Sequence, residues 1–135
     1  MPQPVCPYCG SDVWLVSSSS LKSDRAGLTY ICSRFPDCDA RVNCHPGSIK
    51  PMGSLGDPQL RRWREKAHKK FDQLWQSGSM SRRQAYCWLA QAMNLPESET
   101  HFAQFNQQQC QQAIDLTTVY QRKSYNIAVK HIHTG

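Results

Sequence analysis

The sequence lacks long apolar runs and the usual signatures of an active site. No stretch of its 135 residues approaches the roughly 20 apolar residues that cross a membrane, and Met1 to Leu15 show no charged start followed by an apolar segment. A glycine-rich phosphate loop, a His-Glu-x-x-His pair and a nucleophile elbow are all missing. We therefore expect a soluble, cytoplasmic, non-enzymatic protein with no membrane partner and no small-molecule substrate.

Acidic residues are also few, with 10 Asp and Glu against 16 Lys and Arg. A metal-dependent nuclease would need a second ion in oxygen-rich coordination, which scattered carboxylates do not favour. A hydrolase would require the fold to gather Asp57, His68 and Asp72, and nothing in the sequence indicates that it does. The formal net charge of +6 instead favours a polyanionic partner.

Cysteine, in contrast, is plentiful: five of the seven lie between Cys6 and Cys44. An odd number in a reducing compartment favours a metal site over disulfides. Cys6-Pro-Tyr-Cys9-Gly10 has the outline of a zinc knuckle, and Cys32 and Cys38 follow after 22 intervening residues. Two such pairs predict one tetrahedral Zn²⁺. Four thiolates leave no open position on the ion, so the zinc is expected to be structural.

Two alternatives for the metal site stay open at this point. Cys44 or His45 could replace one of the four ligands. A second site is also conceivable, built from Cys44, His45, His68, Cys87, His101 or Cys110. We prefer to interpret Cys87 and Cys110 as small apolar residues buried on helices.

The N-terminal region predicts short strands. Val13 to Val16 form an apolar run before a polar loop at 17–20, and Leu28 to Cys32 form a β-branched and aromatic run that delivers Cys32. Residues 45–56 are rich in proline, glycine and serine and have no periodicity, which is typical of a linker or a wrapped loop.

From Asp57 onward the apolar spacing becomes helical. Asp57 and Pro58 predict a helix start and Gln76 its end; the apolar stripe is Leu60, Trp63, Ala67, Phe71 and Leu74. A second helix begins after Ser81, with Gln84 completing a capping box, and Leu95 and Pro96 stop it. Its expected inward residues are Ala85, Trp88, Leu89, Ala92 and Met93.

A third helix is predicted after Asn106, with Gln109 in the matching capping position and an end between 116 and 121. Its expected inward residues are Cys110, Ala113 and Ile114. The fold class is thus α+β. It comprises a four-cysteine zinc ribbon over 1–44 with two or three antiparallel strands, a linker loop over 45–56, and a helical domain of three or more helices over 57–122. The remaining tail, 123–135, is either disordered or pairs as a strand.

Basic and aromatic residues suggest a nucleic-acid interface. Between Pro58 and Lys70 the first helix carries six basic residues against Glu65 alone, an excess that favours phosphate binding, although the wet side of an amphipathic helix is often basic. The rings of Tyr8 and Phe35 could stack on bases. Trp14 and Tyr30 are expected in the core instead. The candidate binding residues are Tyr8, Arg34, Phe35, Arg41, Arg61, Arg62, Lys66, Lys69, Lys70, Arg82 and Arg83.

The cysteine motifs also carry a resemblance. Cys6-Pro-Tyr-Cys9-Gly10, followed by Tyr30-Ile-Cys32-Ser-Arg-Phe-Pro36-Asp-Cys38, resembles the zinc ribbon repeated at the C-terminus of bacterial type I topoisomerases. The resemblance covers about the first 44 residues. It implies that Cys6, Cys9, Cys32 and Cys38 bind zinc and that the ribbon contacts single-stranded DNA.

The helical region adds a second resemblance, through Leu60-Arg-Arg-Trp-Arg-Glu-Lys-Ala-His68 and Ser81-Arg82-x-x-Ala85-Tyr86-x-Trp88-Leu89-Ala90. Together with the ribbon, these residues are similar to a zinc-finger-containing family of phage and prophage proteins. That resemblance implies a fold outline and, if the origin is a phage, the cytoplasm of a bacterial host. It implies no reaction.

Two functions therefore remain to be weighed. The first is binding of DNA or RNA, single-stranded or structure-selective, through the ribbon and the basic helix. The alternative is a phage-type protein-interaction module or inhibitor that docks on a host or defence nucleic-acid complex. Steep salt dependence of oligonucleotide binding would distinguish the first from the second.

Overall fold

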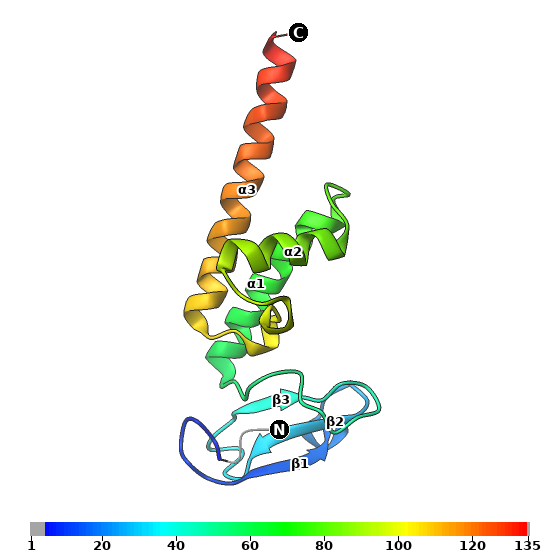
Figure 1. Ribbon diagram of the computed structural model, residues 1–135. Coiled ribbons are helices and arrows are strands. Elements are labelled where there is room, and N and C mark those ends of the chain that lie inside the picture. The colour runs from blue at the N-terminus through cyan, green and yellow to red at the C-terminus, as the bar shows by residue number, and fades with distance from the viewer. Residues whose placement is uncertain (1–4, 135) are drawn as a thin grey trace. The chain divides into compact units, whose positions relative to one another are not determined.

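The computed structural model describes the backbone of residues 5–134 and the side chains of residues 5–123. The chain forms two compact units, Met1–Arg62 and Trp63–Gly135. The first contains a small sheet and its loops, and the second contains helices (Figure 1). This arrangement confirms the predicted α+β class. Within the described residues, no helix is long and apolar enough to cross a membrane.

Three antiparallel strands form the sheet of the first unit, in the order β1-β2-β3. They are β1 (Val13–Ser17), β2 (Leu28–Cys32) and β3 (Arg41–Asn43). The prediction for β2 is confirmed residue for residue, and β1 is one residue longer than predicted. A short 3₁₀ turn, η1 (Ser18–Leu21), replaces the polar loop after β1. The alternation of backbone hydrogen bonds fixes the register, which pairs Val13 with Cys32 and Tyr30 with Val42.

The segment predicted as a linker or a wrapped loop is a wrapped loop. The Arg41 and Gly56 backbones exchange two hydrogen bonds of 3.1 and 3.0 Å, and Met52 N donates to Asn43 O at 2.8 Å. Leu55 is buried in the same small core as Tyr30 and Val42. Residues 51–56 therefore cover the outer edge of β3 and belong to the ribbon unit.

The main helices are α1 (Pro58–Gln76), α2 (Arg82–Met93) and α3 (Gln107–Thr134), with 3₁₀ turns η2 (Glu97–Glu99) and η3 (Phe102–Gln104) between the last two. The predicted starts are confirmed. Asp57 Oδ1 accepts from Leu60 N at 2.8 Å. Reciprocal capping boxes join Ser81 to Gln84 and Asn106 to Gln109 at 2.8 to 3.1 Å.

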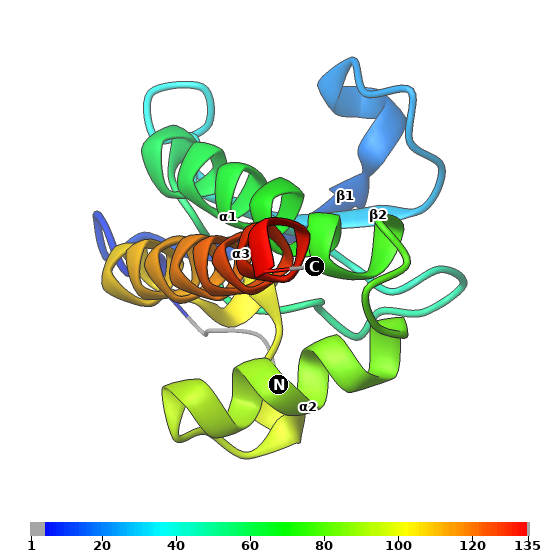
Figure 2. The same ribbon diagram turned by 90° about the horizontal axis from the view of Figure 1, so that it is seen from above.

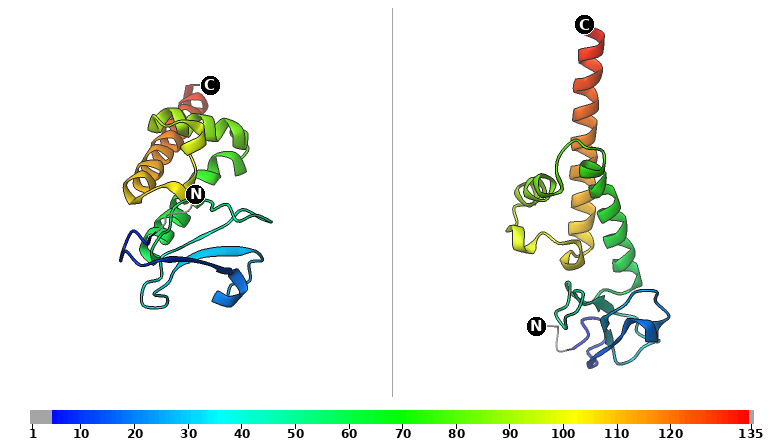
Figure 3. Two further views of the ribbon diagram at one scale, coloured as in Figure 1. Left: turned by 60° about the horizontal axis from the view of Figure 1, so that its bottom comes forward. Right: turned by 90° about the vertical axis from the view of Figure 1, so that its right-hand side faces the viewer.

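The predicted end of the third helix was wrong. α3 continues to Thr134, well past residue 121, and is drawn as the long helix that extends beyond its neighbours (Figure 3). Residues 122–134 contain neither glycine nor proline, so nothing in the sequence stops the helix. The predicted tail at 123–135 is thus helical as far as Thr134. The predicted domain limits stay predictions.

The helices of the second unit share one apolar core. Ala67, Phe71 and Leu74 of α1 are buried as the stripe predicts, whereas Trp63 packs at its margin. α3 runs beside α1 (Figure 2) and contacts it through a Gln121–Gln73 hydrogen bond. α3 contacts α2 through the rings of Tyr120 and Trp88. The remaining buried members of this core are Ala85, Leu89, Met93, Phe102, Phe105, Cys110 and Ala113.

Two details of this helical core differ from the prediction. In α2 Ala90 is buried and Ala92 is exposed. The buried face of this helix is therefore rotated slightly about the helix axis relative to the predicted face. In α1 the basic Arg64 is buried, and its Nε donates to Phe105 O at 2.9 Å. A buried guanidinium needs such acceptors, and its partner lies 41 residues away, out of reach of local pattern analysis.

Candidate metal centre

Two turns bring four cysteine sulfurs together at one end of the sheet. Cys6 and Cys9 lie on the turn before β1, Cys32 ends β2, and Cys38 lies in the loop that follows β2. All four sulfurs lie within 4.8 Å of one another. Cys6 Sγ is 3.6 Å from Cys38 Sγ, and Cys9 Sγ is 3.4 Å from Cys32 Sγ. Zn–S bonds of about 2.3 Å in a tetrahedron place sulfurs about 3.8 Å apart, so the four side chains fit one Zn²⁺.

Backbone hydrogen bonds shape both turns around the sulfurs. In the first, Cys6 N donates to Ser11 O at 2.7 Å and Gly10 N donates to Cys6 O at 2.8 Å. Gly10 has φ +75°, a conformation that glycine adopts without a steric penalty. In the second, Cys38 N donates to Arg34 O, and Arg34 N points at Cys32 Sγ at 3.4 Å. Such amide contacts stabilise negative charge on a thiolate.

Cys9 ionises more readily than Cys32 and Cys38. Burial raises the pKa of Cys32 to about 12 and also raises the pKa of Cys38. Hydrogen bonds from the side chain and backbone of Ser11 lower the pKa of the exposed Cys9 to about 6. A divalent cation offsets the cost of burying thiolates, so its binding would release protons. Four sulfur donors leave no position for substrate or water, which fits a structural ion.

Family comparison agrees with this geometry. A family model described as a zinc-finger-containing domain matches residues 3–120. The chain belongs to this family. No curated protein and no solved structure matches the chain.

The zinc-finger-containing domain thus combines the four-cysteine cluster with the helical unit as far as Tyr120. The four cysteines that the sequence analysis selected are the ones that the structure gathers. They are also the only group of three or more cysteine, histidine or acidic side chains that the described residues place at metal-binding distances.

The other cysteines and histidines whose side chains the structure describes lie outside this cluster. Cys44 is buried in the ribbon core but outside the sulfur cluster. Cys110 is fully buried, as predicted, whereas Cys87 is only partly buried and its Sγ donates to Glu97 Oε1 at 2.9 Å. His68 Nε2 lies 3.4 Å from Asp72 Oδ1, while Asp57 caps α1.

Some of the ribbon's candidate nucleic-acid residues are exposed to solvent, and others form ion pairs within the unit. Tyr8 and Phe35 are 46% and 39% exposed. Trp14, which we predicted in the core, is 55% exposed. Successive side chains of a strand point to opposite faces of the sheet, and it is the neighbouring Val13 that packs against the small core. Tyr30 is buried as predicted.

Asp39 engages two of the predicted arginines. Arg41 contacts Asp39 Oδ1 at 2.6 Å and also lies over the Phe35 ring at 5.6 Å. Arg61 contacts Asp39 Oδ2 at 3.0 Å and donates to Gly56 O and Asp39 O. Sequence analysis missed this role of Asp39, and its distance of 22 residues from Arg61 leaves no local signal for it.

The candidate basic residues that follow Arg61 on α1 and those on α2 are mostly exposed. Lys66 lies over the Trp63 ring at 5.2 Å, Lys69 pairs with Glu65 at 3.4 Å, and Arg82 lies over the Tyr86 ring at 5.4 Å. Arg62 and Arg83 are exposed, and Lys70 is half-buried. These contacts are at the surface, where ion pairs and cation–π contacts are weak enough to exchange for phosphate. The assignment of these residues to a nucleic-acid interface stays a prediction.

Proposed function

We propose that this protein binds nucleic acid without catalysis, using its zinc ribbon as the base-stacking element and the basic residues of α1 for phosphates. One observation carries the proposal. Three aromatic rings of the ribbon unit, those of Tyr8, Trp14 and Phe35, are exposed by 39 to 55%. A small domain that buries few large side chains would gain stability by burying such rings, so their exposure favours a binding role.

The rings favour unpaired bases over a closed duplex. Aromatic side chains stack on single-stranded bases with little dependence on sequence, at about 1–3 kcal/mol per base. Arg34 is exposed beside this set of rings in the sequence, and Arg41 holds a guanidinium over Phe35. We therefore propose single-stranded or structure-selective recognition rather than sequence-specific reading of the major groove.

The charge of α1 supports the same proposal. Arg62, Lys66 and Lys69 are exposed, and Lys69 is the only one of them whose side chain pairs with an acidic residue among the described residues. Each phosphate that such a residue neutralises releases condensed counterions, which makes affinity fall as salt rises. Arg61 is less suited to this role, because Asp39 and Gly56 already occupy its guanidinium.

Fluorescence anisotropy with labelled single-stranded and duplex DNA and RNA over a salt series tests the proposal. Replacing Tyr8 and Phe35 by Ala should weaken single-strand binding by about 5- to 100-fold. The exposed aliphatic Ile49 of the same unit provides the matched control, and Ile49→Ala should change nothing. Lys66→Gln should instead lower the salt slope by about one. Absence of binding to any oligonucleotide at low salt would refute the proposed function.

Exposed aliphatic residues favour a second candidate function, that of a protein-interaction module such as a phage inhibitor of a host or defence nucleic-acid complex. Val5, Leu15 and Ile49 of the ribbon unit are exposed by 40 to 65%. Apolar surface of this kind is common where proteins dock. This candidate predicts a complex with a protein partner that tolerates salt and is weakened by Leu15→Ser, together with no affinity for oligonucleotides, measured by gel filtration of the mixed proteins.

A further inference from the structure

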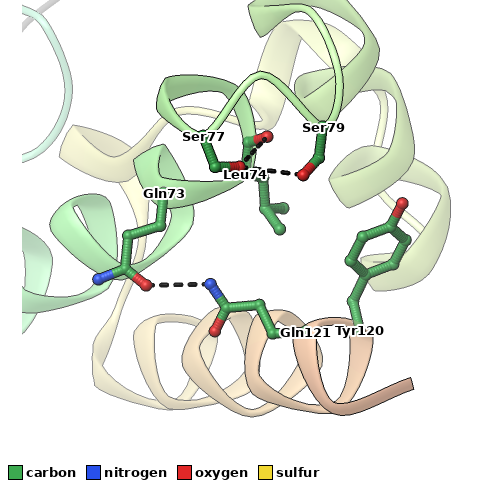
Figure 4. A pocket seen from close by; sticks show the side chains of 6 residues that line it. All are labelled: Gln73, Leu74, Ser77, Ser79, Tyr120 and Gln121. Carbon is green, nitrogen blue, oxygen red and sulfur yellow. Dashed lines mark hydrogen bonds between the residues drawn. The ribbon is translucent and has the colours of Figure 1, made fainter. Parts of the chain in front are cut away.

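The helical unit carries an open pocket that no function above uses. It lies between the C-terminal end of α1, the loop after α1, and α3 (Figure 4). Its volume is about 410 Å³, within the range of about 300–1,000 Å³ that small-ligand sites occupy. The lining residues are Gln73, Leu74, Ser77, Ser79, Tyr120 and Gln121.

The lining is uncharged and combines polar groups with a larger share of apolar surface, which restricts what can bind. Two amides, two hydroxyls and a phenol surround the buried side chain of Leu74. Among the described side chains, no cationic one lines the pocket, so a phosphate or carboxylate would lose its hydration without compensation. A purely aliphatic ligand would leave the amides and hydroxyls without partners. The lining therefore suits an uncharged molecule with both apolar faces and polar edges.

Tyr120 supplies an aromatic wall that is already fixed in place. Its ring packs against Trp88 of α2, with the centroids 5.2 Å apart and the planes at 60°. Tyr120 is half-buried, so part of the ring remains accessible. A fixed aromatic wall favours a flat ligand, because stacking then costs little conformational entropy.

The hydrogen bonds within the pocket leave both donors and acceptors available. Gln121 Nε2 donates to Gln73 Oε1 at 3.0 Å, which leaves the Gln73 amide hydrogens and Gln121 Oε1 for other partners. Ser77 Oγ donates to Leu74 O and lies 3.0 Å from Ser79 Oγ. Ser79 then gives its hydrogen to Ser77 and offers its lone pairs as acceptors. Mixed donors and acceptors beside an aromatic wall match the edge and face of a nucleobase.

We propose that this pocket binds one uncharged, planar heterocycle of nucleobase size, stacked on Tyr120 and hydrogen-bonded by Gln73, Ser79 and Gln121. The heterocycle comes either from a free nucleoside or from an unpaired base of a bound strand, and the second source rests on the proposed function. Amide side chains pair well with base edges because they present a donor and an acceptor side by side. The ligand is held and not transformed.

Two measurements on the full chain distinguish the sources. The first is saturation-transfer NMR with adenosine, thymidine and uridine, for which we expect a dissociation constant of about 1 mM, typical of a small ligand in an open pocket. The second is anisotropy with a single-stranded oligonucleotide and with the same strand carrying abasic sites throughout. Tyr120→Leu should weaken binding of the intact strand by about 5- to 100-fold. It should leave binding of the abasic strand unchanged within about twofold.

Matched variants separate stacking from a general loss of structure. Tyr120→Phe keeps the ring and should retain binding, and Gln121→Ala should lose base binding without disturbing the Trp88 contact. Val119→Ala changes an exposed neighbour on α3 that does not line the pocket and should have no effect. If Tyr120→Leu fails to fold, Gln121→Ala tested on the two strands takes its place.

Each pattern of results decides the proposal. Oligonucleotide binding that Tyr120→Leu and Gln121→Ala do not alter, with no nucleoside signal, refutes the pocket and leaves the proposed function standing. A nucleoside signal that Gln121→Ala abolishes, without oligonucleotide binding, supports the pocket and refutes the proposed function. An equal loss on intact and abasic strands also refutes base binding in the pocket.

Discussion

The two compact units bury different kinds of side chain. In the ribbon unit, three of the seven buried core residues are cysteines and the largest is Tyr30. In the helical unit, the ten buried core residues include three phenylalanines, two leucines and a methionine. A core as small as the first cannot hold a fold of this size by itself, whereas the second resembles an ordinary apolar core. The same chain thus uses coordination in one unit and packing in the other.

The two units also differ in where their aromatic side chains lie. The helical unit places Phe71, Phe102 and Phe105 inside, where they support the fold. The ribbon unit leaves Tyr8, Trp14 and Phe35 exposed. Coordination by four sulfurs removes the need to bury these rings. A unit held by a metal can therefore leave large side chains exposed.

The largest expected effect comes from removing one sulfur ligand. Cys32→Ser should lose the stoichiometric zinc and unfold the ribbon, because apparent binding free energies of structural zinc reach about 10–16 kcal/mol. Zinc analysis per chain and amide hydrogen exchange resolved by unit would show the loss, with the helical unit still protected. Cys44→Ala is the matched control, since Cys44 is buried outside the cluster. One zinc per chain retained by Cys32→Ser would show that the ligand set is wrong.

The helical unit should instead be destabilised by a substitution that leaves a cavity in its apolar core. Phe71→Ala removes a fully buried ring that contacts Tyr86 and Phe102. We expect the free energy of unfolding of this unit to fall by about 3–5 kcal/mol, measured by denaturant unfolding. Zinc content should stay at one per chain. If the Phe71→Ala protein loses its zinc, the stability of the ribbon unit depends on packing in the helical unit, which would contradict the prediction.

A buried thiol provides a pH test of the helical unit. Burial raises the pKa of Cys110 from 9.0 to about 11. Between those values the unfolded chain loses the proton while the folded chain keeps it, so this contribution to stability is present below pH 9 and is lost as pH rises towards 11. The difference corresponds to about 2–3 kcal/mol.

Comparing the wild-type protein with Cys110→Ala isolates that contribution. Both proteins are unfolded with denaturant at pH 8 and at pH 11, and the wild type should lose more stability between the two conditions. All other titratable groups are the same in both proteins and cancel in the comparison. An identical loss in the two proteins would mean that the thiol is not buried in the folded state.

The smallest expected effect concerns Asp39 in the ribbon unit. Asp39→Asn removes the charge that Arg41 and Arg61 share. Because the side chains are 23 to 30% exposed, solvent screens the pairs, and we expect a loss of about 1–2 kcal/mol with the zinc retained. Asp37→Asn changes an exposed carboxylate two residues away and should be neutral. If both variants are neutral, coordination alone supports this part of the ribbon.

Features fixed by neighbours in sequence were predictable from the sequence alone. Ser81 and Gln84 meet because they are three residues apart at a helix start, and the spacing of Cys6 and Cys9 brings their thiols together on one turn. β2 was predictable because its five residues, three of them β-branched or aromatic, lie between turn formers.

Features fixed by distant partners were not predictable. The exposure of Trp14 depends on which side of β1 lacks a cover, and the apolar character of a short strand does not reveal that. Burial of Arg64 depends on Phe105 O, and closure of the wrapped loop depends on Gly56 meeting Arg41. The pocket beside Tyr120 is formed by α1, the loop after it and α3, whose lining residues lie more than 40 positions apart and form no motif.

The wrapped loop at 51–56 also bears on self-association. Its backbone occupies the N–H and C=O of Arg41 and the C=O of Asn43 along the outer edge of β3. Fibrous growth by strand addition requires two open edges on each copy, because every added chain must present a new one. With β3 closed, β1 is the only strand of the described part of the chain that can receive another, so pairing of two copies through β1 would leave no edge for a third. Such assembly would end at a symmetric pair.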